Sequence, residues 1–249
     1  MVFDELTLSL PKPKPLRLAE CALFLDLDGT LAPIAARPQD VRPEPRRTRL
    51  LERLNEALEG RLAVISGRTL ADVDRILEGR VTSVAAVHGL VRREPDGSTH
   101  EAAPHPRLAD ATRQLREFAG RDSGLLVEEK GLSVALHYRL ARAHGEEAHA
   151  LAVAICEETG LNLQRGDMVE ELRTPGPNKG DSVRAFLAQP AFRNAQPVFL
   201  GDDCTDEHGF EAAEKSGGMG VLIGPPRRTE ARFRLESVEE ALSWLEAAR

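Results

Sequence analysis

Continuous apolar stretches alternate with helical repeats along the first ninety residues. Residues 21–27 are apolar up to a break at Asp28-Gly29-Thr30, which is typical of a buried parallel strand. Leucines recur with helical spacing through residues 50–58, and Gly60 follows as a stop signal. The expected elements are a helix over 48–58, a strand over 62–65, a helix over 70–77 and a strand over 81–87. This order predicts a parallel sheet with right-handed crossovers.

The pattern changes in the middle of the chain and then returns. Hairpin-like strand pairs mixed with helices indicate an antiparallel α+β unit: helices over 108–118 and 146–159, and strands over 125–129, 132–139, 161–164 and 168–173. The alternation of strands and helices then resumes, with helices over 178–187, 207–215 and 238–245 and strands over 198–200 and 220–223. We therefore expect an α/β, Rossmann-like parallel-sheet core domain, residues 1–103 and 175–249, with an inserted α+β cap domain, residues 104–174. The proline-rich residues 11–15 predict an extended tether ahead of the fold.

Composition limits the cellular compartment and the kinds of partner that we expect of this protein. Three cysteines without metal-ligand spacing, a start unlike a signal peptide and no apolar run of about 20 residues predict a cytoplasmic protein away from membranes. The formal net charge of −7 disfavours nucleic acid as a partner. It would repel a small anionic substrate as well, so such a substrate needs a metal ion or a few placed cations. The sequence is compatible with a monomer and does not fix the oligomeric state.

Reactive side chains follow the predicted strands or begin a predicted helix. Asp26 and Asp28 end the first strand, Ser66 follows the second, Lys179 begins a helix, and Gly201-Asp202-Asp203-Cys204-Thr205-Asp206 follows a later strand. The carboxyl ends of parallel strands line one crevice, which is where ligands bind in open α/β sheets. These residues should therefore converge, although 176 positions separate Asp26 from Asp202.

A cluster of carboxylates needs a cation. Two carboxylates about 4 Å apart repel by about 4 kcal/mol at an effective dielectric of 20. Oxygen ligands without histidine or cysteine favour Mg²⁺ over Zn²⁺. Carboxylates, Mg²⁺, a lysine and a serine hydroxyl together form a receptor for a phosphoryl group. The sequence therefore predicts a magnesium-dependent phosphoryl-transfer site.

The segment Asp26-Leu27-Asp28-Gly29-Thr30 resembles the DxDGT signature of the haloacid-dehalogenase superfamily, and Ser66, Lys179 and Gly201-Asp202-Asp203 match its later motifs in order. This resemblance implies that Asp26 is a nucleophile that forms an aspartyl phosphate, and that Asp28 is the general acid and base. The further roles it implies are Mg²⁺ binding by Asp26, Asp28 (through its carbonyl), Asp202 and Asp206, and phosphate binding by Ser66, Lys179, Gly29 and Thr30. The presence of Asp28 is typical of the phosphatases rather than the dehalogenases.

The middle of the chain is similar to trehalose-6-phosphate phosphatases. The similar segments are residues 128–131, 137–139, 171–175 and 201–207. This similarity implies that Glu128, Lys130, Glu171 and, more weakly, Arg139 bind sugar hydroxyls from the cap, and that the substrate is the sugar phosphate trehalose 6-phosphate. We expect His137 to be structural, and Arg68 either to join the site or only to form a salt bridge.

Two other kinds of function stay open. The same chemistry would serve mannosyl-3-phosphoglycerate, sucrose 6-phosphate or a phosphomannomutase-like reaction. A non-catalytic sugar-phosphate sensor on the same fold would bind without turnover, and the intact set of reactive residues disfavours it.

Overall fold

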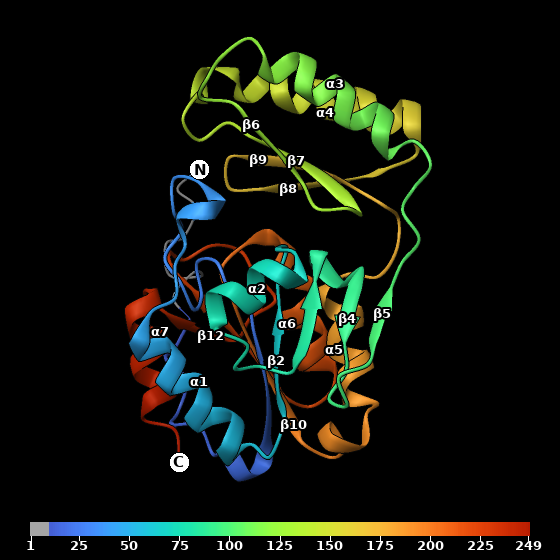
Figure 1. The fold of residues 1–249 in the computed structure, drawn as a ribbon. Coiled ribbons are helices and arrows are strands. Elements are labelled where there is room, and N and C mark those ends of the chain that lie inside the picture. Colours follow the sequence, from blue (N-terminus) through green and yellow to red (C-terminus); the bar gives the residue numbers. More distant parts are fainter. Residues whose placement is uncertain (1–9) are drawn as a thin grey trace. The chain divides into compact units, whose positions relative to one another are not determined.

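The computed structural model describes residues 10–249, which divide into two compact units. Of these residues, 10–99 and Asn178–Arg249 form the core unit, and His100–Pro177 form the cap unit. The predicted boundaries lie four residues later at the first junction and three earlier at the second. Figure 1 shows helices and strands in both units. The predicted α/β core with an inserted α+β cap is confirmed.

The core unit is built on a sheet of eight strands in the order β12-β11-β10-β1-β2-β3-β4-β5. The first six strands in this order pair in parallel, and β4 pairs with β3 in the antiparallel direction. The strands are β1 (Cys21–Leu25), β2 (Leu62–Ile65), β3 (Ser83–Ala86), β4 (Val91–Arg93), β5 (Thr99–Glu101), β10 (Gln196–Gly201), β11 (Met219–Ile223) and β12 (Phe233–Leu235).

Helices lie on both faces of this sheet (Figure 1). They are α1 (Pro45–Ala57), α2 (Leu70–Leu77), α5 (Lys179–Leu187), α6 (Glu207–Lys215) and α7 (Val238–Glu246). Phe24, Phe186 and Phe199 belong to one buried aromatic cluster, which joins β1, α5 and β10. Successive strands move outward in opposite directions from β1 and β10, so the topology reverses between them. That point is where an open α/β sheet binds ligands.

The cap unit has a four-stranded antiparallel sheet in the order β6-β7-β9-β8. Its strands are β6 (Leu126–Glu129), β7 (Ser133–His137), β8 (Asn162–Gly166) and β9 (Val169–Arg173). Two helices, α3 (Leu108–Ala119) and α4 (Gly145–Thr159), cover one face of the sheet (Figure 1). Leu115, Leu136 and Leu172 lie in the buried cluster between them, so the cap has its own hydrophobic core.

The structure differs from the predicted elements mainly at short segments. Residues 62–65, 70–77 and 207–215 form the predicted elements with the same bounds, whereas β4, β5 and β12 were not predicted. Each of these three strands is three residues long and carries charged residues, so period-2 alternation is hard to detect. β1 ends at Leu25 rather than Leu27, because the chain turns away from the sheet after Asp26.

The proline-rich segment is extended, as predicted, but it is bound to the core unit instead of lying free ahead of it. The carbonyl of Pro11 accepts from the Arg234 amide at 3.0 Å, and that of Lys14 accepts from the Trp244 indole at 3.0 Å. Lys12 pairs with Glu240 of α7. Within residues 10–249, no helix combines the length and apolarity needed to cross a bilayer.

Candidate functional site

The ends of β1 and β10 and the start of α5 bring three charged side chains together. The Lys179 ammonium donates to Asp26 Oδ1 at 2.8 Å and to Asp206 Oδ1 at 2.6 Å. All three residues are buried, with Asp206 fully inaccessible and Asp26 only 4% exposed. Carboxylate oxygens of Asp26, Asp202 and Asp206 lie within 4.8 Å of one another. The structure therefore confirms the predicted convergence of these four residues.

Local structure explains how each group reaches this point. The Asp26 amide donates to the Leu200 carbonyl at 3.0 Å, which continues the β1–β10 pairing up to the nucleophile candidate. Asn178 and Asp181 form a capping box at the start of α5, and this fixes Lys179 in the first turn. A cation there opposes the helix dipole, and the two carboxylates compensate for it.

Glycine at position 29 permits the close approach of the two acidic loops. Gly29 has φ +81°, and a Cβ there would lie 2.0 Å from the Asp202 carboxylate. Its amide donates to the Ala32 carbonyl at 2.7 Å, which closes the turn after the first strand. Any other residue would push Asp202 away from Asp26, so this glycine is required by packing as well as by backbone conformation.

Burial and like charge dominate the electrostatics. Burial, followed by the neighbouring Asp26 carboxylate, raises the pKa of Asp202 to about 9. Burial also raises the pKa of Asp26 above its ordinary value, with Lys179 opposing this effect and Asp206 adding to it. Three ionised carboxylates and one ammonium leave a formal charge of −2 at this point. Bound protons or a divalent cation would relieve that excess.

The donor set fits a hard divalent cation. Asp202 Oδ1 and the Thr30 hydroxyl are buried, and within residues 10–249 neither has a hydrogen-bond partner. Asp206 is different, because its Oδ1 accepts from Lys179 and its Oδ2 accepts from the amides of Asp202 and Asp203, both at 3.1 Å. Asp206 thus connects Lys179 with the amides of its own loop.

Asp28 has a separate environment from Asp26. Its carboxylate receives two hydrogen bonds from the Arg68 guanidinium, at 2.6 and 2.7 Å, and Arg68 also donates to the Pro38 carbonyl at 2.9 Å. This bidentate pair fixes the direction of the acid–base candidate. Arg68 thus forms the predicted salt bridge, and its partner is the acid–base candidate Asp28. Ser66 is buried at the end of β2 and accepts from the Arg68 amide at 3.2 Å.

Three of the four predicted sugar-binding residues, Glu128, Lys130 and Glu171, form a second polar cluster, on the cap-sheet face that α3 and α4 leave uncovered. Lys130 Nζ lies 2.7 Å from Glu171 and 3.9 Å from Glu128. His137 Nε2 lies 2.8 Å from Glu128, and Ser133 donates to Glu171 at 2.6 Å. Burial opposes ionisation of Glu128, but the His137 hydrogen bond and the Lys130 charge outweigh it and lower the pKa of that carboxyl.

Sequence reasoning found part of this cluster. It did not include Ser133, and it treated His137 as structural. The signal lies in the hairpin register, since Glu128 pairs with Ala135, which pairs with Glu171 in β9. Residues two positions from Ala135 share its face, and they are Ser133 and His137. Arg139 instead donates to the carbonyl and the carboxylate of Asp167, at 2.8 and 2.9 Å.

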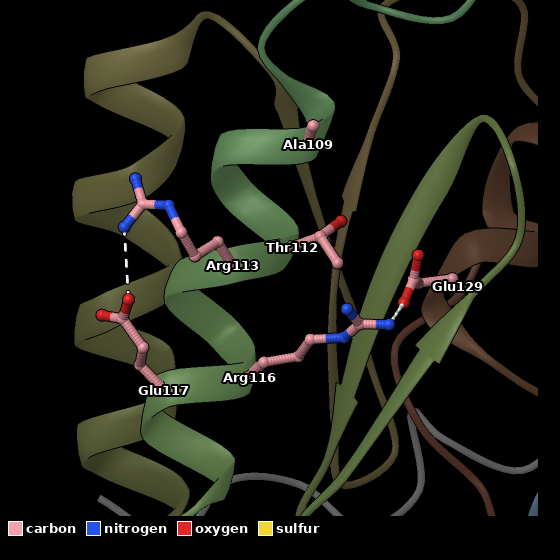
Figure 2. Close-up of a pocket in the computed structure, with 6 residues that line it drawn as sticks. All are labelled: Ala109, Thr112, Arg113, Arg116, Glu117 and Glu129. Atoms are coloured by element: carbon pink, nitrogen blue, oxygen red, sulfur yellow. Dashed lines mark hydrogen bonds and ion pairs between the residues drawn. The ribbon is translucent and has the colours of Figure 1, made fainter.

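A hollow of about 470 Å³ lies on the opposite side of the cap sheet (Figure 2). Its lining comes from α3 and from Glu129, which alternates with Glu128 along β6. Arg116 pairs with Glu129, and Arg113 pairs with Glu117 at 3.2 Å. Its charged side chains are thus paired with one another, and none of the predicted site residues lines it.

Comparison with known proteins agrees with this arrangement. The trehalose-phosphatase family model matches residues 24–239. A trehalose-6-phosphate phosphatase of Escherichia coli K12 is 39% identical over 230 residues, which are 92% of this chain and 86% of that protein. A probable trehalose-phosphate phosphatase of Sinorhizobium fredii is 39% identical over 207 residues, 82% and 78% of the two chains.

Solved structures support the fold. The C-terminal domain of the C. albicans trehalose-6-phosphate phosphatase matches with a TM-score of 0.83 at 21% identity, covering 95% of this chain and 97% of that one. The predicted resemblance to trehalose-6-phosphate phosphatases is therefore confirmed. The chain belongs to the trehalose-phosphatase family.

Proposed function

We propose that this chain is a phosphoric monoester hydrolase that converts trehalose 6-phosphate to trehalose and orthophosphate, with Mg²⁺ as cofactor and Asp26 as nucleophile. The observation that carries the proposal is the convergence of Asp26, Lys179, Asp202 and Asp206 at the point where the sheet topology reverses. Family membership and the names of the relatives support the substrate.

Asp26 and Asp202, together with the backbone carbonyl of Asp28, would hold the cation, and Asp206 would contact it directly or orient the loop. The all-oxygen donor set favours Mg²⁺ over Zn²⁺. When bound, Mg²⁺ supplies charge neutralisation for the carboxylates and for the phosphoryl oxygens. Lys179, Ser66 and the Thr30 hydroxyl would orient the phosphoryl group beside Asp26.

The protein's own residues then carry two steps. In the first, an Asp26 oxygen bonds to phosphorus, the bond from phosphorus to the sugar oxygen breaks, and Asp28 gives its proton to that oxygen. In the second, the Asp28 carboxylate takes a proton from water, whose oxygen attacks phosphorus. Phosphate leaves and the Asp26 carboxylate is regenerated. While one oxygen of Asp28 carries the proton, the other oxygen would still accept from Arg68, so Arg68 would orient Asp28 in both steps.

The nucleophile and the substrate can be tested together. Phosphate release from trehalose 6-phosphate should stop with EDTA and return with Mg²⁺, and Asp26→Asn should lower kcat by at least about 1,000-fold. Sucrose 6-phosphate and mannosyl-3-phosphoglycerate should give lower kcat/KM values. A variant that retains normal turnover would exclude Asp26 as nucleophile. Tight substrate binding by the wild-type chain without turnover would favour the sugar-phosphate sensor.

The effect of an Arg68 substitution on the hydrolysis rate should depend on the leaving group of the substrate. Arg68→Ala should slow hydrolysis of trehalose 6-phosphate by about 10- to 100-fold, because a sugar alkoxide needs a proton from Asp28. p-Nitrophenyl phosphate, whose leaving group needs no proton, should lose much less, and Arg68→Lys should lie between. Arg80→Ala, which removes an exposed pair with Glu52, serves as a control. Equal slowing of both substrates would contradict this role.

The polar cluster of the cap should act on sugar recognition alone. Lys130→Met should lower kcat/KM for trehalose 6-phosphate by about 10-fold or more, because the buried Glu171 carboxylate loses the ammonium group 2.7 Å away. Hydrolysis of p-nitrophenyl phosphate should stay close to wild type. Arg116→Met is the matched control, since it removes an exposed ion pair on the opposite face of the same sheet. A similar loss in both variants would argue against the assignment.

The charge excess predicts a pH-dependent stability. Folding raises the pKa of Asp202 to about 9, so the folded protein keeps a proton on this carboxyl group at pH values where the unfolded chain has lost it. The free energy of unfolding is therefore highest below the ordinary pKa near 4 and decreases as pH rises toward 9. In EDTA, Asp202→Asn should therefore raise Tm by about 2–4 °C, with a larger gain at pH 9 than at pH 5.

The same variant should lose the Mg²⁺-induced rise in Tm that we expect of the wild-type chain. Asp110→Asn, which changes an exposed residue of the cap, should keep that rise and show no pH-dependent gain. A pH-independent effect of Asp202→Asn, measured by thermal unfolding in matched buffers, would refute the charge-excess account.

A further inference from the structure

Hydrogen bonds to the peptide groups on either side of its Cα fix the direction of the Asp202 side chain. The amides of Asp202 and Asp203 both donate to Asp206 Oδ2 at 3.1 Å. The peptide group between Asp202 and Asp203 is also held at its carbonyl end, by Arg227 at 3.3 Å. Both dihedral angles at Asp202 are therefore restrained by hydrogen bonds, and with them the direction of its Cα–Cβ bond.

Arg227 reaches this loop from the segment between β11 and β12. Its Nη2 donates to the carbonyls of Asp203, at 2.9 Å, and Asp202, and its Nη1 pairs with Glu207 at the start of α6. The Arg227 side chain is 25% exposed. One planar guanidinium thus spans two successive carbonyls of the loop and the first residue of the helix that follows it.

Glu207 also forms hydrogen bonds with the segment that carries Arg227. Its Oε2 accepts from the Thr229 hydroxyl at 3.1 Å and from the Glu230 amide at 2.7 Å. The ion pair between Arg227 and Glu207 is therefore one part of a closed network between residues 227–230 and the loop that ends β10. Such a network gives the guanidinium a fixed position from which to hold the two carbonyls.

We propose that Arg227 is a positioning residue for the cation site, which acts by fixing the Asp202 backbone. The inference rests on the proposed metal-dependent function and adds a residue to it. Arg227 contacts the backbone of the loop, so its effect should fall on metal affinity and much less on the chemistry at saturating metal. Outer-shell partners of metal ligands typically change affinity or activity by about 10- to 100-fold.

The test measures Mg²⁺ binding directly. Calorimetric titration of the substrate-free protein and the Mg²⁺ dependence of Tm should both show about 10-fold weaker binding in Arg227→Ala than in the wild type. Arg227→Lys should recover part of the affinity, because it keeps the charge without the planar fork. Arg228→Ala, which removes the exposed neighbouring side chain, is the control and should bind Mg²⁺ like the wild type.

Phosphate release completes the test. The Mg²⁺ concentration for half-maximal rate should rise in Arg227→Ala in step with the calorimetric value, while kcat at saturating Mg²⁺ stays near the wild-type value. Equal Mg²⁺ affinity in wild type and variant overturns the positioning role and leaves the proposed function intact. A wild-type chain that binds no Mg²⁺ overturns both. If Arg227→Ala does not fold, Arg227→Lys and Arg227→Gln provide the same comparison.

Discussion

The buried contact of Lys179 with Asp26 and Asp206 is the interaction on which the core site depends. Its two distances, 2.8 and 2.6 Å, join residues of β1, α5 and the loop after β10 where water hardly reaches. Removing one partner of such a cluster leaves an uncompensated buried charge, which is costly. With Asp202 nearby, the cluster still carries more negative than positive charge. The fold therefore holds together a site that is complete only with an added proton or cation.

Strand pairing and core packing in the rest of the core unit hold these carboxylates together against their mutual repulsion. The strand ends are fixed by parallel pairing between β1 and β10 and by the buried aromatic cluster of Phe24, Phe186 and Phe199. Gly29 and Gly201 let the backbone approach Asp202 and Asp206, because a Cβ would lie 2.0 Å and 2.3 Å from those carboxyl groups. Packing in the core unit thus compensates for the close approach of these carboxyl groups.

The proposed phosphoryl chemistry and the proposed sugar recognition belong to units with separate hydrophobic cores. The core unit packs α5 and α6 on its sheet, and the cap packs α3 and α4 on a different one. Cross-strand register aligns Glu128 with Glu171 through Ala135, and Lys130 contacts both carboxylates from the turn after β6. Under the proposed function, substitutions on that cap face would change the sugar that is accepted while the aspartate cluster stays as it is.

The sequence by itself determined the order of the helices and of all strands except the short β4, β5 and β12, the inserted second unit and the acidic motifs. Apolar periodicity and residues such as Asp26 and Lys179 are local signals, and those three strands are too short to show such a periodicity. The sequence also allowed the inference that strand-end residues converge, since parallel strands share one edge. Only the tertiary structure decided that Arg68 holds Asp28, that His137 joins Glu128 and that Arg227 braces the loop of Asp202. These contacts link residues from 9 to 40 positions apart through side-chain directions, which depend on packing and leave no periodic trace in the chain.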